Sequence, residues 1–485
     1  MKVQSPHFHD HIPGALADQN LQYALGKLAT GFPVKRKEAA AKLPEFDALR
    51  DHARDIKNHV LENLDSYLDH YEAQVVAAGG AVHWCATAED ACAEILKICR
   101  SVNAKTVTKS KTMIGEEIAI NDYLADHGVE PVETDLGEYI IQLRNEPPSH
   151  IIAPAIHLTK GQVADTFRHH HQDLDPARAL EEPRVMLDEA RARLRGRFVA
   201  ADVGITGANM LVAESGTNIL VTNEGNAELT YGLPRVHIVI ASIEKIVPTF
   251  EDATTILRVL ARSATGQEIT VYTSFCTGPK RPTDVDGPDE YHVILLDNGR
   301  SKMLGSEFQD MLRCIRCGAC INHCPVYGAL GGHAYGWVYP GPMGSVLTPA
   351  LVGIDDSKHL PNASTLCGRC ESVCPMRIPL PRMLRAWREK AVEAAGPGTT
   401  QARGLRLWAW FAARPATYRL VFGLGTFALS LLGGLKGRFR RLPLLGGWTK
   451  TRDLPAPQAQ SFQMQWRQQA AMQGRKTHPN QDSAP

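Results

Sequence analysis

The sequence of 485 residues has almost no net charge, because 53 Lys and Arg side chains balance 52 Asp and Glu side chains. This balance excludes a strongly basic nucleic-acid-binding protein, since such proteins need many Lys and Arg contacts to phosphates. The first 20 residues also lack the apolar run that a signal peptide contains. We therefore expect a protein of the reducing cytoplasm that has no nucleic-acid partner.

Nucleotide-binding and hydrolase motifs are lacking as well. The P-loop pattern and the G-x-S-x-G pattern do not occur in the chain. A G-x-G-x-x-A pattern begins at Gly423, but no strand is expected before it and no acidic residue follows about twenty positions later. The sequence therefore predicts no dinucleotide-binding site.

Acidic residues are missing from one long segment, because residues 401–452 contain ten Lys and Arg but no Asp or Glu. This segment includes the uncharged run Leu420–Leu435, which at 16 residues is shorter than the ~20 that a spanning helix needs. Its aromatic residues are Trp408, Trp410, Tyr418 and Trp448. Such a composition is typical of a segment that binds an anionic membrane surface, here the inner face. A docking segment for a partner subunit and a buried helical hairpin are the alternatives.

Apolar residues recur at helical spacing between residues 44 and 78, and strand and helix patterns then alternate to about residue 300. This alternation predicts an α/β domain with a largely parallel sheet. Tyr139–Leu143 is one of the expected strands. The predicted divisions are an N-terminal arm and helices (1–69), an α/β domain (70–300), a helical ferredoxin-type domain with two clusters (301–398), and a basic apolar segment with a flexible tail (399–485).

Cysteines are concentrated in one region, where seven of the eleven lie between Cys314 and Cys374. The run C-x2-C-x2-C-x3-C-P that begins at Cys314 has the spacing of bacterial ferredoxins, in which the fourth cysteine binds the other cluster. A second run, C-x2-C-x3-C-P, begins at Cys367. We therefore predict two iron–sulfur clusters, the first a 4Fe-4S cluster on Cys314, Cys317, Cys320 and Cys374, and the second on Cys324, Cys367 and Cys370.

The second run lacks its first cysteine, since position 364 is Ser364. The second cluster is then either a 3Fe-4S cluster or a 4Fe-4S cluster whose fourth iron takes an oxygen, solvent or substrate ligand. A site that has lost its function, or a cysteine from elsewhere in the chain, would also explain the gap. Zinc is the alternative for the first run, although zinc sites usually combine paired C-x2-C or Cys/His motifs.

Polar residues lie between the glycines of residues 204–225 in the α/β domain. Ligands usually bind at the strand ends of such a sheet. The candidate pocket residues are Asn209, Glu214, Asn223, Glu224 and Asn226. Turns and caps that stabilise tight loops would use the same residue types. Lys109 and Lys111 could neutralise a carboxylate, and a solvated basic surface is the simpler interpretation of them.

Three stretches resemble a known family. They are DVGITGANMLVAESGTNILVTNEGNAE (Asp202–Glu228), TKSKTMIGEEIAIN (Thr108–Asn121) and GHAYGWVYPGPMG (Gly332–Gly344). Together with the two cysteine runs, including the missing cysteine at position 364, they resemble the LUD-domain iron–sulfur proteins of the lactate utilisation protein B family. The resemblance covers roughly residues 20–465.

This resemblance implies a fold and a function. It implies a LUD-type α/β domain, similar to isomerases and CoA transferases, followed by a helical ferredoxin-type domain. The implied function is electron transfer within a multi-subunit complex that oxidises L-lactate to pyruvate. The implied partners are a cysteine-rich subunit and a second LUD protein. As an alternative, the LUD pocket and the open iron of the second cluster would act directly on an organic acid.

Overall fold

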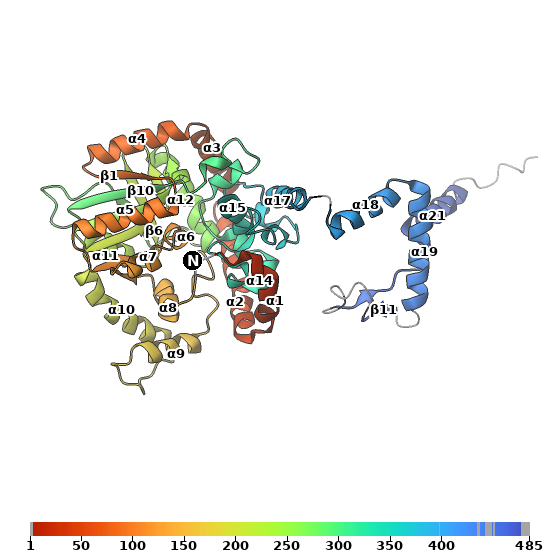
Figure 1. Ribbon diagram of the computed structural model, residues 1–485, viewed down its shortest axis with the longest axis horizontal. Coiled ribbons are helices and arrows are strands. Elements are labelled where there is room, and N and C mark those ends of the chain that lie inside the picture. Colours follow the sequence, from red (N-terminus) through yellow and green to blue (C-terminus); the bar gives the residue numbers. More distant parts are fainter. Residues whose placement is uncertain (1–2, 397, 434–436, 442–448, 450–451, 477–485) are drawn as a thin grey trace, which may run out of the picture. The chain divides into compact units, whose positions relative to one another are not determined.

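The computed structural model describes residues 3–396, 398–433, 437–441, 449 and 452–476. The chain forms two compact units, Met1–Ala391 and Val392–Pro485. Figure 1 shows the first unit as a sheet covered by helices, with further short helices beside it. Each unit is described separately below.

A six-stranded sheet forms the centre of the first unit. All of its strands run parallel, in the order β1-β10-β7-β4-β2-β3. Parallel sheets are stable when helices cover both faces, and every residue of β7 is accordingly buried. The strands are β1 (Ala81–Cys85), β2 (Thr106–Lys109), β3 (Glu130–Glu133), β4 (Val203–Gly207), β7 (Val236–Ser242) and β10 (Glu290–Leu296).

Helices pack on both faces of this sheet. On one face, Ile95 of α5 packs with Ile205 and Ile238 of the sheet, and on the other face Tyr71 of α4 packs with Val239. The helices of this region are α4 (Leu64–Ala77), α5 (Ala88–Ser101), α6 (Met113–Glu117), α7 (Ile120–Asp126), α8 (Leu136–Arg144), α9 (Lys160–His170), α10 (Pro183–Ala200) and α11 (Asn226–Gly232).

A second, four-stranded sheet has the order β8-β5-β6-β9. Its members are β5 (Met210–Val212), β6 (Thr217–Thr222), β8 (Ile246–Val247) and β9 (Tyr272–Cys276). Met210 and Ile219 of this sheet belong to the same hydrophobic core as α3 (Phe46–Glu62), α12 (Phe250–Ala264) and the cysteine region. The α/β part and the cysteine region therefore share one core.

The cysteine region consists of short helices, as expected. They are α13 (Ala319–Asn322), α14 (Pro325–Leu330), α15 (Gly341–Val352), α16 (Arg369–Ser372) and α17 (Leu380–Ala395). Single 3-10 turns occur at Ser5–His7, Ile243–Lys245, Ser301–Met303, Gln309–Arg313, His333–Tyr335 and Leu360–Asn362. The N-terminal segment is helical too, since α1 (Phe8–Ala17) and α2 (Gln19–Ala41) contact α14, and α2 also contacts α13 and α12.

The strand expected at Tyr139–Leu143 is wrong. These residues lie in helix α8, which begins after Asp135. The Asp135 side chain accepts a hydrogen bond from the backbone N–H of Glu138 and so caps the helix. The strand of this region is β3 (Glu130–Glu133), and the Leu136, Tyr139 and Ile140 side chains pack in a separate core with α9 and α10.

The second unit contains α18 (Thr400–Ala412), α19 (Pro415–Gly433), β11 (Arg438–Phe439), β12 (Leu454–Pro455) and α21 (Phe462–Lys476). Within the described part of the chain, α19 is the one helix whose length and composition would allow it to cross a membrane. Only 6% of its most apolar 18-residue stretch is buried inside the molecule. It begins five residues before the apolar run expected from sequence. Part of the expected tail forms α21, and Trp448 lies outside the described residues.

Candidate metal centre

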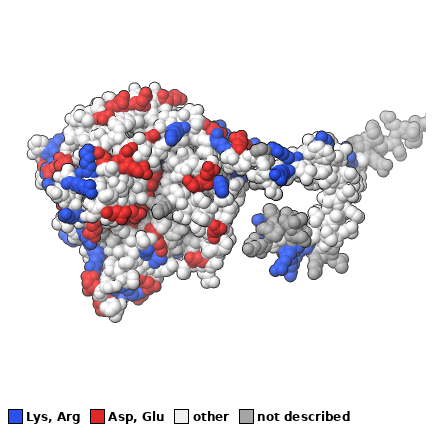
Figure 2. All heavy atoms as spheres, viewed as in Figure 1, with Lys and Arg blue, Asp and Glu red and all other residues white. Residues whose placement is uncertain are grey.

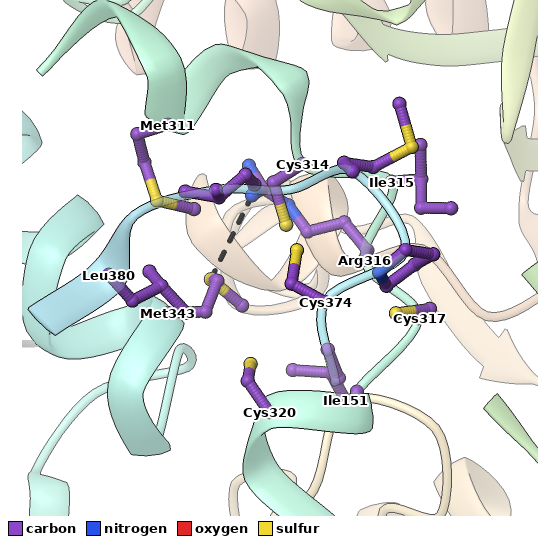
Figure 3. A pocket seen from close by; sticks show the side chains of 14 residues that line it. Ile151, Met311, Cys314, Ile315, Arg316, Cys317, Cys320, Met343, Cys374 and Leu380 are labelled. Atoms are coloured by element: carbon purple, nitrogen blue, oxygen red, sulfur yellow. Dashed lines mark hydrogen bonds between the residues drawn. The ribbon is translucent and has the colours of Figure 1, made fainter. Parts of the chain in front are cut away.

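Four cysteines from both runs line one pocket (Figure 3). Cys314 follows the turn Gln309–Arg313, Cys317 and Cys320 lie at the start of α13, and Cys374 follows α16. Helices α13 and α16 contact each other, which brings the two runs together. The rest of the pocket is largely apolar, with Ile151, Met311, Ile315, Met343 and Leu380 in its lining. The structure thus gathers the four residues that the sequence groups as the first ligand set.

Burial dominates the chemistry of these thiols. It raises the pKa of Cys317 to about 12 and also raises the pKa values of Cys320 and Cys374, and the neighbouring cysteines add to the shifts. Thiols in such a dry site stay protonated unless a metal compensates the thiolate charge. Four sulfur atoms in a dry, apolar pocket fit an iron–sulfur cluster, whose ligands are cysteine thiolates.

The two cysteine runs share an unusual backbone shape. Arg316 and Gly318 have φ values of 57° and 71°, and the corresponding Leu366 and Gly368 have 53° and 78°. A left-handed backbone at these positions turns the chain inward around the sulfur atoms, and non-glycine residues adopt it rarely. Because the loops match, Ser364 holds the place that Cys314 has in the first run. Its hydroxyl oxygen accepts a hydrogen bond of 3.1 Å from the backbone N–H of Leu366.

The other cysteines of the two runs, Cys324, Cys367 and Cys370, form a second group, in which one cysteine is exposed. Burial raises the pKa of Cys370 to about 12, and the nearby Cys324 and Cys367 thiols raise it further. Cys367 itself is exposed, and hydrogen bonds from the Arg369 backbone N–H and the Thr365 hydroxyl lower its pKa. The second group therefore has a solvent-facing side.

Two arginines support the second run, and sequence analysis missed both. Arg50 of α3 donates hydrogen bonds to the carbonyl oxygen of Cys374 at 2.7 and 3.1 Å and to that of Ser372 at 2.8 Å. Arg36 of α2 donates to the carbonyl oxygen of Val373 at 2.8 Å. The partners are more than 300 residues apart, so no local pattern could reveal them. The N-terminal helices thus fix the loop that carries Cys374.

We expect Arg50→Ala to weaken the first cluster site. The change leaves the buried carbonyl oxygen of Cys374 without its donor, which costs about 1–3 kcal/mol, and it loosens the Cys374 loop. The measurement is iron and sulfide content after anaerobic purification, with a loss expected. The control is Arg54→Ala on the same helix, because Arg54 pairs with the exposed Asp51 and Asp55. Equal iron contents in the two variants would contradict the expectation.

A cavity of about 400 Å³ lies against the α/β domain and the first cysteine run. Four of the five candidate pocket residues line it, namely Asn209, Asn223, Glu224 and Asn226. Glu214 does not, because its carboxylate accepts a hydrogen bond of 2.7 Å from the backbone N–H of Phe250 at the start of α12. Glu214 is therefore a helix cap, as the alternative interpretation proposed.

The two candidate lysines have different surroundings. Lys109 is 1% exposed and pairs with Glu116 at 2.9 Å and Glu133 at 2.6 Å, so the interpretation of a solvated surface is wrong for it. Lys111 lines the cavity. Arg316 and Cys317 also line the cavity. Among the residues that the structure describes, Cys324, Cys367 and Cys370 do not line it. The pocket is thus adjacent to the first cysteine group, whereas the alternative function considered above uses the second.

Buried ion pairs connect the α/β domain to the cysteine region. Arg300, which is fully buried, pairs with Glu117 at 2.6 Å and with Glu244 at 3.1 Å. Glu244 also pairs with Arg316 at 3.3 Å. These arginines outweigh burial, so that the pKa of Glu117 is lowered and that of Glu244 falls to about 2. Both carboxylates are therefore ionised at neutral pH.

Comparisons with known proteins agree with this architecture. The LUD domain model matches residues 68–296, the 4Fe-4S dicluster domain model matches residues 310–378, and the model of the C-terminal region of lactate utilisation protein B matches residues 395–471. The predicted fold, an α/β LUD-type domain followed by a helical ferredoxin-type domain, is confirmed. The prediction of an iron–sulfur domain is confirmed as well.

Whole-chain relatives give the same result. Lactate utilization protein B of Lysinibacillus sphaericus is 41% identical, with 95% of this chain and 97% of the relative covered. The protein of the same name from Anoxybacillus flavithermus is 42% identical over 95% of this chain and 98% of the relative. The uncharacterized electron transport protein YkgF of Escherichia coli is 39% identical over 98% of this chain and 99% of the relative. With its LUD, dicluster and C-terminal regions in the same order, this chain belongs to the lactate utilization protein B family.

Proposed function

We propose that this chain is the iron–sulfur electron-transfer subunit of a complex that oxidises L-lactate to pyruvate. The printed names of its relatives refer to lactate utilization and to electron transport. The observation that most supports the proposal is the arrangement of the two cysteine groups. One group lies beside the cavity and has no fully exposed cysteine, and the other reaches the surface at Cys367. An electron carrier needs one redox group near its electron donor and another that a partner can reach at the surface.

The proposed ligands are the two gathered groups. Cys314, Cys317, Cys320 and Cys374 would hold a 4Fe-4S cluster, and Cys324, Cys367 and Cys370 would hold the second cluster. When bound, each cluster would store one electron. Ser364 occupies the position of the missing cysteine, so its hydroxyl or a solvent molecule is the proposed fourth ligand if the second cluster contains four irons.

Metal analysis of the anaerobically purified chain tests this proposal. We expect about seven or eight irons per chain with a similar amount of acid-labile sulfide. Seven irons would indicate a 3Fe-4S second cluster, and eight a 4Fe-4S second cluster. Zinc without sulfide would contradict the proposal, because zinc sites use the same thiolates but contain no inorganic sulfide.

The proposed partners are a cysteine-rich subunit and a second LUD protein. The surface around Cys367 supports a docking site there, because Cys367 is exposed and its neighbour Leu366 is 40% exposed. In this arrangement, Cys367 lies at the point where electrons pass between subunits.

The second unit is proposed to bind the inner surface of the membrane from the cytoplasmic side. Leu405, Leu407, Trp408 and Trp410 of α18 are all exposed. The Arg414 guanidinium lies 4.2 Å from the centre of the Trp410 ring. Figure 2 shows Lys and Arg side chains on this unit among uncharged residues. Exposed aromatic residues with nearby cations favour a lipid surface that carries negative charge.

We expect deletion of 401–452 to abolish binding to vesicles that contain anionic lipid, while iron and sulfide contents stay unchanged, because all seven ligand cysteines lie before the deleted segment. Vesicle flotation measures the binding. Vesicles of neutral lipid are the control, and high salt should release the full chain. Retention of the full chain in salt and in alkaline carbonate would contradict peripheral binding and indicate that α19 spans the bilayer.

A further inference from the structure

The cavity of about 400 Å³ has a rim and a floor of different character. Asn223 and Glu224 at the end of β6 are exposed and form the rim. The buried Lys245 and Cys317 form the floor, with Arg316 beside them. The cavity thus leads from solvent at the strand ends to the first cysteine run. Its volume lies in the range of about 300–1,000 Å³ that is typical of ligand sites.

Around the floor, the cations Lys245, Arg300 and Arg316 outnumber the buried carboxylates Glu117 and Glu244. Lys245 is 7% exposed, and its ammonium has no hydrogen bond or ion pair among the residues that the structure describes. Arg316 shares Glu244 with Arg300, and its Nε atom has no partner within the described chain. Burying a cation without a partner is costly, so such a group usually has a function or an absent counter-ion.

A second lysine adds to this charge. Lys111 donates a hydrogen bond of 2.5 Å to the carbonyl oxygen of Ile152 and forms no ion pair in the described part of the molecule. A carboxylate between Lys111 and Lys245 would take the place of the missing counter-ion. The acidic groups of the cavity, Asp135 and Glu224, are on the rim side, where Glu224 accepts a hydrogen bond from the Leu136 backbone N–H.

The walls offer both hydrogen bonds and apolar contacts. The side-chain oxygen of Asn209 accepts a hydrogen bond from Val221, so its amide N–H groups remain available to a ligand. Phe32, Ile152 and Leu260 supply apolar surface. Few polar groups on an apolar wall are typical of sites that bind and orient a small organic molecule.

We propose that this cavity binds a small organic acid, a 2-hydroxy or 2-oxo acid, with its carboxylate held by Lys245 and Lys111 next to the first cysteine run. The proposal rests on the proposed function and gives the acid a site on this chain. The observation that carries it is that Lys245 and Lys111, neither of which forms an ion pair within the described chain, line the same cavity, and that this cavity meets Cys317.

Lys245 has one competing explanation, because it lies near Cys314 as well as the cavity. A lysine beside a negatively charged cluster could act only as its counter-charge, and charges near a cluster affect its potential. This explanation predicts an altered cluster and unaltered acid binding. Lys111 separates the two explanations, since it lines the cavity and is not among the residues around the four sulfur atoms.

The test is calorimetric titration of the full, anaerobically purified chain with L-lactate, with pyruvate and with inorganic phosphate. We expect at least one of the two acids to bind, and phosphate to bind more weakly. Lys245→Met and Lys111→Met should each weaken acid binding at least tenfold, because each removes a charged hydrogen-bond donor to the carboxylate. The matched control is Lys97→Met, since Lys97 is 75% exposed on α5 and pairs with Glu94.

Each of the following results would overturn the proposal. Absence of acid binding at millimolar concentrations removes the site, and binding that survives both lysine substitutions places it elsewhere. A changed electron paramagnetic resonance signal in Lys245→Met with unchanged acid affinity makes Lys245 a counter-charge only. Phosphate that binds as well as the acids removes the carboxylate assignment. A chain with full iron and sulfide but no acid binding would keep the electron-transfer function and lose only this inference.

Discussion

Replacing Cys374 with serine is expected to remove the first cluster, although Cys374 belongs to the second cysteine run. Its sulfur lies in the same pocket as Cys314, Cys317 and Cys320. Burial raises the pKa of the Cys320 thiol, and the thiols of Cys314, Cys317 and Cys374, with Cys370 of the other group, raise it further. Losing one of four thiolates from a dry site should deplete about half of the total iron, the share of one of two clusters.

The matched control is Cys324→Ser, which should remove the second cluster and leave the first in place. Cys324 belongs to the first run, but the thiols nearest to it are Cys367 and Cys370. Iron analysis with electron paramagnetic resonance of the reduced protein would show which cluster signal each variant retains. Loss of the second cluster in Cys374→Ser, or loss of the same signal in both variants, would contradict the crossed arrangement.

The cysteine groups could be predicted from the sequence because cluster chemistry fixes the spacing of ligands. The spacing C-x2-C-x2-C-x3-C-P indicates that the fourth cysteine of each run binds the cluster of the other run. The structure accordingly places Cys374 in one pocket with the first three cysteines of the first run. Strand alternation likewise predicted the parallel sheet, since buried parallel strands form short apolar runs. These features depend on local sequence, and local sequence is sufficient for them.

Features that depend on distant residues could not be predicted. Tyr139–Leu143 is apolar and contains adjacent isoleucines, which favour a strand, but packing against α9 and α10 and the Asp135 cap make it helical. The support of Cys374 by Arg50 depends on a fold that joins α3 to α16. The surroundings of Lys109 could not be predicted either, because Glu116 and Glu133 approach it only once the sheet has formed.

The Arg300 network gives the second large expectation. Arg300→Met should lower the free energy of unfolding by about 3–5 kcal/mol, because it leaves buried carboxylates without their partner. Glu117 would retain hydrogen bonds from Tyr339 at 2.6 Å and Asn298 at 2.7 Å, whereas Glu244 would retain only Arg316 as an ion-pair partner among the described residues. Urea unfolding of the anaerobic full chain measures the change, and a loss below about 1 kcal/mol would contradict it.

The triple variant Glu117→Gln, Glu244→Gln, Arg300→Met separates the effect of the buried charges from that of side-chain shape. It removes both buried carboxylates and Arg300 but leaves the buried Arg316 without its ion-pair partner, so only part of the stability lost in Arg300→Met should return. The pKa values of Glu117 and Glu244 are lowered in the folded chain. In the parent protein, the stability that these groups contribute is therefore complete above their unfolded pKa of about 4.3. It declines as the pH falls towards about 2, the folded value of Glu244. The triple variant should lose this part of the acid sensitivity, and an unchanged stability profile between those pH values would show that the network does not hold the two domains together.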